Sequence, residues 1–154
     1  MNTYLKKFID AKFQNPGKAL YLGAGDLSDI TYLKRLGWEG EGVDIKTGID
    51  LKKLYQSKNK PFDLVYSNYL LHQLKNKKQL IQTAFANLMN DGWFFIHTFD
   101  QSDPSGKSNI TTDFLKKLLE KQGFKNISTR IFNFYDDEEG HKHWHKILEA
   151  NAQK

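Results

Sequence analysis

The sequence predicts one α/β domain, built on a mainly parallel sheet with helices on both faces. Short apolar stretches of strand length alternate with stretches whose apolar residues recur every three or four positions, as in strands joined by helical crossovers. Near the end of the chain this alternation stops. Residues 127–135 and 143–150 read as two strands joined by the acidic, glycine-ended turn 136–140. We therefore expect a C-terminal antiparallel β-hairpin beside the parallel strands.

Length and composition fit a single soluble domain. The chain has 154 residues, of which 39% are hydrophobic and 27% are charged, and this length suffices for a proper core. We expect one domain over residues 1–154, with an N-terminal helix and turn at 1–17 and the core at 18–150. No apolar run approaches the roughly 18 residues that a membrane helix needs, and no signal-peptide core is present, so we expect a cytoplasmic protein without a membrane partner.

The helical periodicity falls in four stretches, each followed by a residue or pair that ends helices. Glycine adopts the left-handed backbone beyond a helix end more readily than other residues. The stretches are residues 2–14 before Gly17, 30–36 before Gly37, 80–88 before Asp91-Gly92 and 114–119 before Gly123. Because each carries an apolar stripe, we expect all four helices to pack on the sheet.

The organising element is the stretch 19–29, which reads as a buried strand, a glycine turn and a helix start. The strand breaks at Gly23 and Gly25, and Ser28 is the expected N-cap of a helix that begins near Ile30. Glycines let backbone N–H groups approach a ligand closely, and the first amides of a helix attract negative charge. A glycine turn is also an ordinary connection between a strand and a helix, so this stretch alone does not identify a ligand.

Two cofactor classes use such a turn, and Asp26 helps to separate them. Gly23, Gly25 and Ser28 approach the fingerprint of dinucleotide-binding proteins. A carboxylate at position 26 repels a pyrophosphate but attracts the ammonium group of an amino-acid ligand. The turn therefore suits S-adenosylmethionine better than NAD.

Downstream residues add a nucleoside-binding pattern. Residues 38–44 read as a second strand that ends at Asp44, nineteen positions after Gly25 (44 minus 25). A carboxylate that binds ribose hydroxyls falls at this place, at the carboxyl end of the neighbouring strand. Residues 61–68 follow as a third strand that runs into a loop reaching Leu74, and 93–99 form a fourth, apolar strand.

In this order, the motifs resemble those of the class I S-adenosylmethionine-dependent methyltransferases, especially the small type 11 domains that mostly act on small molecules. The resemblance covers roughly residues 18–150. The matching segments are 20–25 for motif I, 42–44 for the ribose-binding motif, 62–74 for motif IV, and 88–96 for the helix-turn-strand that follows. It implies a Rossmann-like fold, S-adenosyl-L-methionine as cofactor and a small-molecule methyl acceptor.

Carried over to this chain, the resemblance implies a set of cofactor-binding residues. They are Gly23, Ala24, Gly25 and Asp26 at the methionyl part, Asp44 at the ribose, Ile45, Asp50 and Leu51 at the adenine, and Ser67 and Asn68 closing the pocket.

The chain departs from the family pattern at three places. Tyr21 stands where an acid is usual, and Leu27 stands where a third glycine is common. Only residues 45–60 separate the ribose acid from motif IV, so the helix and strand that the family has there are expected to be shortened.

Methyl transfer from a sulfonium is an in-line displacement, which needs the two reactants held in line, water excluded and, for many acceptors, a base. Tyr69 and His72, in the loop after the third strand, are the expected catalytic residues, with Asp100 as a further candidate base. His97 lies inside an apolar strand and is expected to be a hydrogen-bonded core residue.

Several alternatives remain open at this stage. Residues 141–145 carry three histidines at alternate positions, but one strand rarely closes a zinc tetrahedron, so we expect no metal site. The charge of +5 makes a nucleic-acid partner possible, but only two of the 23 basic residues are arginine, so a solvated lysine surface is favoured. Rival functions are an NAD-dependent oxidoreductase and a non-catalytic module that binds nucleotide ligands or RNA.

Overall fold

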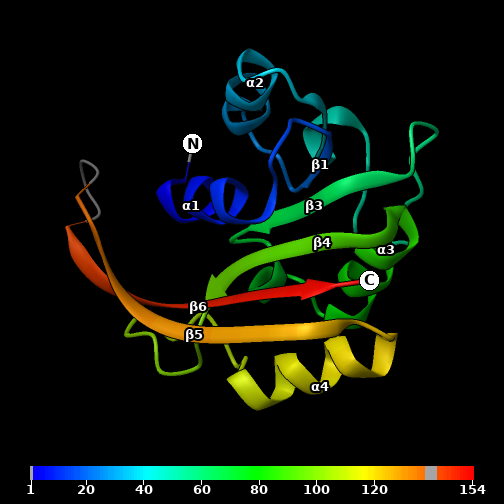
Figure 1. The fold of residues 1–154 in the computed structure, drawn as a ribbon. Helices are drawn as coiled ribbons and strands as arrows, with labels where there is room; N and C mark the ends of the chain where they lie inside the picture. The colour runs from blue at the N-terminus through cyan, green and yellow to red at the C-terminus, as the bar shows by residue number, and fades with distance from the viewer. Residues whose placement is uncertain (1, 138–141) are drawn as a thin grey trace.

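The computed structural model describes residues 2–137 and 142–154, and its centre is one six-stranded sheet (Figure 1). The strand order is β2–β1–β3–β4–β6–β5. The strands are β1 (Lys18–Leu22), β2 (Glu39–Val43), β3 (Phe62–Asn68), β4 (Leu88–Phe99), β5 (Lys125–Asp136) and β6 (His143–Gln153). The first four are parallel, whereas β6 runs antiparallel to both β4 and β5. The predicted parallel sheet with a C-terminal antiparallel hairpin is confirmed.

Helices cover both faces of the sheet, as predicted (Figure 1). The helical elements are α1 (Thr3–Lys12), α2 (Ser28–Arg35), α3 (Lys77–Asn87) and α4 (Thr112–Gln122), with single 3-10 turns η1 (Ile45–Thr47) and η2 (Leu71–Gln73). Apolar residues of α1 and α2 pack into one buried cluster, and those of α3 and α4 pack into another. None of the described helices is both long and apolar enough to cross a membrane.

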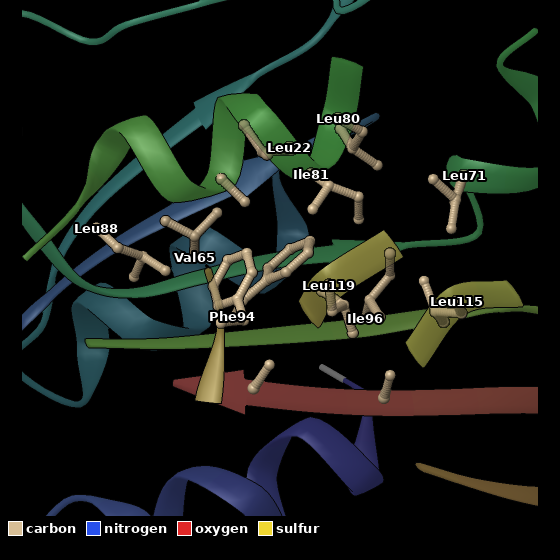
Figure 2. Close-up of a cluster of buried hydrophobic side chains, with 14 of the residues drawn as sticks. Leu22, Val65, Leu71, Leu80, Ile81, Leu88, Phe94, Ile96, Leu115 and Leu119 are labelled. Atoms are coloured by element: carbon tan, nitrogen blue, oxygen red, sulfur yellow. The ribbon is translucent and has the colours of Figure 1, made fainter. Parts of the chain in front are cut away.

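The alternation of side chains along each strand divides the core into these two clusters. On β3, Leu64 and Tyr66 pack on the side of α1 and α2, while Val65 packs on the side of α3 and α4. Figure 2 shows the second side, where Val65 and Phe94 from the sheet lie near Ile81 of α3. Burying each such side chain contributes about 1.5 to 3 kcal/mol to stability.

The segment between β2 and β3 is short, as the sequence indicated. Its helical structure is limited to η1, it contains no strand, and β2 lies at one edge of the sheet. Glu41 of β2 ties this segment down instead. Its carboxylate accepts hydrogen bonds from the Tyr55 hydroxyl (2.7 Å), the Ser57 hydroxyl (2.7 Å) and the Asn59 amide (2.9 Å).

Two predicted boundaries are wrong. Helix α2 begins at Ser28 rather than near Ile30, and the N-cap position is Leu27, whose backbone is left-handed (φ 64°) and whose side chain does not cap. Asp91-Gly92 lies inside β4 rather than before it, because this pair is bonded to the end of the chain. Asp91 N donates to Lys154 O and Lys154 N donates to Gly92 O, and β6 correspondingly extends beyond residue 150.

Several distant segments meet at the carboxyl ends of the parallel strands. In Figure 1 the N-terminus of α1 and the loop after β4 lie on this side of the sheet, and the β5–β6 hairpin extends past the other strands there. Ligands of open α/β sheets bind at this edge.

Candidate functional site

The glycine turn after β1 places backbone amides beside the end of β2. Gly23 N and Ala24 N both donate to Val43 O, at 2.9 and 3.1 Å, and Gly25 N donates to Asp44 Oδ2 at 3.3 Å. Gly23 has a φ of +82°, and a Cβ there would lie 2.8 Å from the Leu70 side chain. A Cβ at Gly25 would meet no atom within 4 Å, so the turn leaves open space at Gly25.

Asp44 is fixed in place by the backbone around it. Its Oδ1 accepts from Lys46 N at 3.0 Å, and its own N–H donates to the Thr47 hydroxyl at 2.9 Å, which completes a capping box at η1. Each carboxylate oxygen can accept a further hydrogen bond. The carboxylate is therefore rigid and can accept hydrogen bonds from a diol.

A cavity of about 290 Å³, which we call the nucleoside cavity, adjoins this carboxylate. Its lining combines two carboxylates with apolar side chains, and its residues are Gly23, Asp44, Ile45, Ile49, Asp50, Leu51, Lys52, Leu70, Gln73 and Leu74. The structure thus brings together five of the residues expected to bind the cofactor: Gly23, Asp44, Ile45, Asp50 and Leu51. Apolar walls for a base and acids for hydroxyl groups fit an adenosine moiety.

Other expected cofactor residues lie outside this cavity. Ser67 is fully buried and its hydroxyl donates to Leu22 O at 2.9 Å, so it holds β1 and β3 together within the core. Asp26 is exposed. Hydrogen bonds from Ser28 lower the pKa of Asp26, whose carboxylate accepts from Ser28 N. Ala24 is buried beneath the turn.

Asn68 lies at the end of β3 with part of its polar capacity unused. Its Nδ2 donates to Asp29 Oδ2 at 3.3 Å, while its buried Oδ1 has no hydrogen-bond partner in the described part of the chain. Asp29 is a buried carboxylate that no motif in the sequence indicated. Tyr21, at the usual position of an acid, stacks on Tyr66 at 4.3 Å in the core.

Tyr69 and His72, the expected catalytic residues, line a second cavity. This middle cavity, about 460 Å³, is lined by Tyr69, His72, Gln73, Phe99 and Lys107. Tyr69 has a left-handed backbone (φ 57°), and burial raises the pKa of its hydroxyl to about 12. Burial, with Lys107 and Lys77 nearby, lowers the pKa of His72 to about 4. At neutral pH, Tyr69 is thus a hydrogen-bond donor and His72 is a neutral imidazole.

A third cavity, which we call the aromatic cavity, lies between α1, the loop after β3 and the hairpin. It measures about 470 Å³, and its lining residues are Asn2, Thr3, Tyr4, Tyr69, Phe99, Phe134, Asp136, Asp137, His145 and Ile147. The middle cavity shares Tyr69 and Phe99 with it, and shares Gln73 with the nucleoside cavity. The three cavities therefore adjoin one another along the carboxyl edge of the sheet, with the middle cavity sharing wall residues with each of the other two.

His145 in the aromatic cavity forms a buried pair with Asp103. Its Nδ1 lies 3.1 Å from Asp103 Oδ2, which also accepts from Lys146 N at 2.6 Å. Burial opposes ionisation of Asp103, but hydrogen bonds from Ser105, Lys146 and His145 outweigh it and lower the pKa of this carboxyl. Because the ionised Asp103 carboxylate can only accept, His145 Nδ1 carries the proton of this hydrogen bond. The sequence showed His145 only as part of the histidine run, whereas Asp103 comes from a distant loop.

His97 is a core residue, as predicted. It is fully buried, its Nε2 lies 2.8 Å from Glu149 Oε2, and its Nδ1 lies 3.0 Å from Asn2 Nδ2. Asp100 accepts from Ser102 and orders the loop rather than lining the three cavities. In the described ranges, 2–137 and 142–154, no group of three acidic or histidine residues is placed to hold a metal ion. His141 lies outside those ranges.

Comparisons with known proteins agree with this arrangement. A family model described as a methyltransferase domain matches residues 1–139. Among curated proteins, none matches the sequence.

Solved structures share the fold at low sequence identity. An S-adenosylmethionine-dependent methyltransferase from Archaeoglobus fulgidus is 17% identical, with a TM-score of 0.72 over 99% of this chain and 92% of that one. Another from Mesorhizobium loti is 18% identical, with a TM-score of 0.72 over 96% of each chain. The 1,6-didemethyltoxoflavin N1-methyltransferase from Burkholderia thailandensis is 19% identical, with a TM-score of 0.70 over 96% of this chain and 75% of that one.

The family match spans most of the chain and favours the methyltransferase over both rival functions, the NAD-dependent oxidoreductase and the non-catalytic module. The protein therefore belongs to the methyltransferase-domain family, in the S-adenosylmethionine-dependent class that the sequence resemblance predicted.

Proposed function

We propose that this protein transfers a methyl group from S-adenosylmethionine to a small-molecule acceptor, with adenosine in the nucleoside cavity and the acceptor in the aromatic cavity. The observation that carries this proposal is the series of three adjoining cavities, with Asp44 at one end and Tyr4 and His145 at the other. A donor and an acceptor in the two end cavities meet near Tyr69, which lines the aromatic cavity and the middle cavity.

The residues of the nucleoside cavity fit the cofactor. Asp44 accepts the ribose hydroxyls, while Ile45 and Leu51 flank the base and Asp50 accepts from its amino group. The open space at Gly25 allows the methionyl chain to approach the backbone.

S-adenosylmethionine supplies an electrophilic methyl group on a sulfonium sulfur. The task of the protein is to hold the acceptor in line with that methyl group and to exclude water, which is the main source of rate enhancement in such a displacement. Burial raises the pKa of Tyr69 to about 12, so its hydroxyl stays protonated well above neutral pH and orients the acceptor by donating a hydrogen bond. His72 borders the middle cavity as a neutral side chain.

The size of the aromatic cavity supports a small acceptor. Its volume of about 470 Å³ falls in the range of small-molecule sites. The structurally similar Burkholderia thailandensis enzyme binds 1,6-didemethyltoxoflavin together with S-adenosylhomocysteine. We therefore favour a small molecule over a nucleic acid.

Calorimetry with S-adenosylmethionine, S-adenosylhomocysteine and NAD tests this function. We expect the two sulfur ligands to bind and NAD to give no heat. Asp44→Ala should weaken binding of S-adenosylhomocysteine by about 1 to 3 kcal/mol, because the hydroxyl groups lose a charged acceptor. Asp44→Asn, which keeps the shape of the side chain, should show a smaller loss in the same direction.

Glu120→Ala, which removes an exposed carboxylate on α4, is the matched control and should bind like the wild type. An unchanged dissociation constant in both Asp44 variants would remove Asp44 from the site. Absence of binding by both sulfur ligands would contradict the proposed function itself.

A further inference from the structure

The aromatic cavity has a charge opposite to that of the whole protein. The chain carries a formal net charge of +5, yet the described residues that line this cavity include Asp136 and Asp137 and no lysine or arginine. Lys107 lies in the middle cavity instead. The net positive charge of the protein would attract anions to its surface. Because this cavity is acidic instead, it indicates a ligand that carries positive charge.

The walls of the cavity suit an organic cation. Aromatic rings from four parts of the chain line the space: Tyr4 from α1, Tyr69 from the loop directly after β3, Phe99 from the end of β4, and Phe134 from β5. Aromatic faces attract ammonium groups and also pack against the apolar part of a ligand. This lining favours an organic amine over an inorganic cation, because an inorganic cation would require oxygen ligands on several sides.

The segments that carry Tyr4, Phe99 and His145 are held by hydrogen bonds and ring stacking, so these three rings have defined positions. Asn2 Oδ1 accepts from Tyr4 N at 2.9 Å, while its Nδ2 contacts His97 within the sheet at 3.0 Å. Asp100 N donates to Lys146 O at 3.0 Å and joins the loop after β4 to β6. The Phe99 ring stacks on His145, with centroids 4.6 Å apart and an interplanar angle of 18°.

An amine bound as a cation needs a proton acceptor before it can react, because an ammonium nitrogen has no free electron pair. His145 lines the cavity and is oriented by Asp103, which holds the proton on Nδ1 and leaves the pair on Nε2. This is the arrangement of a histidine that serves as a general base with a carboxylate behind it.

We propose, on the basis of the function proposed above, that the methyl acceptor is a small amine, held as a cation by the aromatic walls and Asp136 and Asp137. His145 Nε2 takes one proton from the ammonium nitrogen, and Asp103 stabilises the resulting imidazolium. The freed electron pair of the amine then forms a bond to the methyl carbon, while the carbon–sulfur bond breaks and its electrons remain on sulfur. The products are the methylated ammonium, S-adenosylhomocysteine and protonated His145, which returns its proton to solvent. Asp103 is thus a positioning residue and His145 a catalytic one.

The first test compares three phenyl-containing probes of similar size and different charge on protein saturated with S-adenosylhomocysteine. Calorimetry with phenethylamine, 2-phenylethanol and 3-phenylpropionate should show that the amine binds at least about 10-fold more tightly than the other two. Asp137→Asn and Asp136→Asn should each weaken amine binding by about 3- to 10-fold and leave the alcohol unaffected. Glu120→Gln, which removes the same charge on α4, should leave all three probes unchanged.

The second test separates binding from proton transfer. His145→Gln keeps an amide that can donate to Asp103 but removes the titratable nitrogen, so its kcat for phenethylamine should fall by about 100-fold while the amine dissociation constant stays within about 2-fold. An unchanged kcat, or no methylation of a bound amine by the wild type, would overturn the role of His145.

The outcomes distinguish this inference from the function on which it rests. Protein that binds S-adenosylhomocysteine but prefers the alcohol or the carboxylate overturns the amine assignment alone, as does retention of full amine affinity in both aspartate variants. Protein that does not bind S-adenosylhomocysteine overturns the proposed function as well.

Discussion

The two ends of the cavity series are built in different ways. The nucleoside end rests on the shortest strands, β1 and β2, with five residues each, and on a turn whose backbone amides contact β2 directly. The aromatic end rests on the long hairpin β5–β6, and its lining residues range from Asn2 to Ile147. The first end uses local backbone geometry, whereas the second assembles side chains from distant segments.

A strand that supports each end carries a glutamate that ties separate segments together. Glu41 of β2 holds the segment after η1 through three hydrogen bonds. Glu149 of β6 joins His97 of β4 to Arg130 of β5, and His97 contacts Asn2 at the start of α1. Glu149 is only 6% exposed, whereas Glu41 is half-buried. The comparison indicates that the aromatic end depends more strongly on its glutamate.

The largest effect is expected for Glu149→Ala. This change leaves the buried His97 Nε2 without its acceptor and should lower the free energy of unfolding by about 3 kcal/mol, measured by urea denaturation.

The contribution of Glu149 to the free energy of unfolding depends on pH. Burial raises the pKa of Glu149, but hydrogen bonds from His97 and Arg130 outweigh it, and the net pKa is lowered. Its contribution is therefore present at neutral pH and lost as the pH falls through the acid range.

A smaller loss is expected for Glu41→Ala at the other end. Three donors lose a charged acceptor at a half-buried site, so the free energy of unfolding should fall by about 2 kcal/mol. Glu39→Ala, on the same strand and exposed, is the matched control. If Glu41→Ala destabilised the protein more than Glu149→Ala, the difference drawn between the two ends would be wrong.

The smallest effect at neutral pH concerns His72, which lies between the two ends. Its pKa in the folded protein is about 4, against an ordinary value of 6.5, because burial opposes the charged form. The unfolded chain takes up this proton first as the pH falls, so stability decreases from about pH 6.5 down to about pH 4. His72→Gln should flatten this part of the curve of melting temperature against pH. An identical curve in the variant would show that His72 does not cause the decrease.

The same contrast explains what could be predicted from the sequence. The strand, the glycine turn and Asp44 belong to one short stretch of chain, so their spacing alone indicated the nucleoside end. The hairpin was also predictable from its alternation and its turn. Ser67 was expected at the site but faces the core. This could not be predicted, because a single apolar run does not show which face of a strand each residue lies on.

The aromatic end could not be predicted because its contacts are tertiary. Asp103 and His145 are 42 positions apart and meet only when β6 pairs with β4 and the loop folds over it. The left-handed backbone of Tyr69, which gives this residue access to two cavities, has no signature in the sequence. Asp91-Gly92 has the residue types of a turn. Its place inside β4 could not be predicted, because its partner, Lys154, lies at the far end of the chain.

A crystal structure of the protein with S-adenosylhomocysteine tests the central claim most directly. We expect the ribose hydroxyls at the Asp44 carboxylate, the base between Ile45 and Leu51, and the sulfur atom facing Tyr69 and the aromatic cavity. Density for the ligand at another place, or a sulfur atom that faces away from the aromatic cavity, would contradict the account.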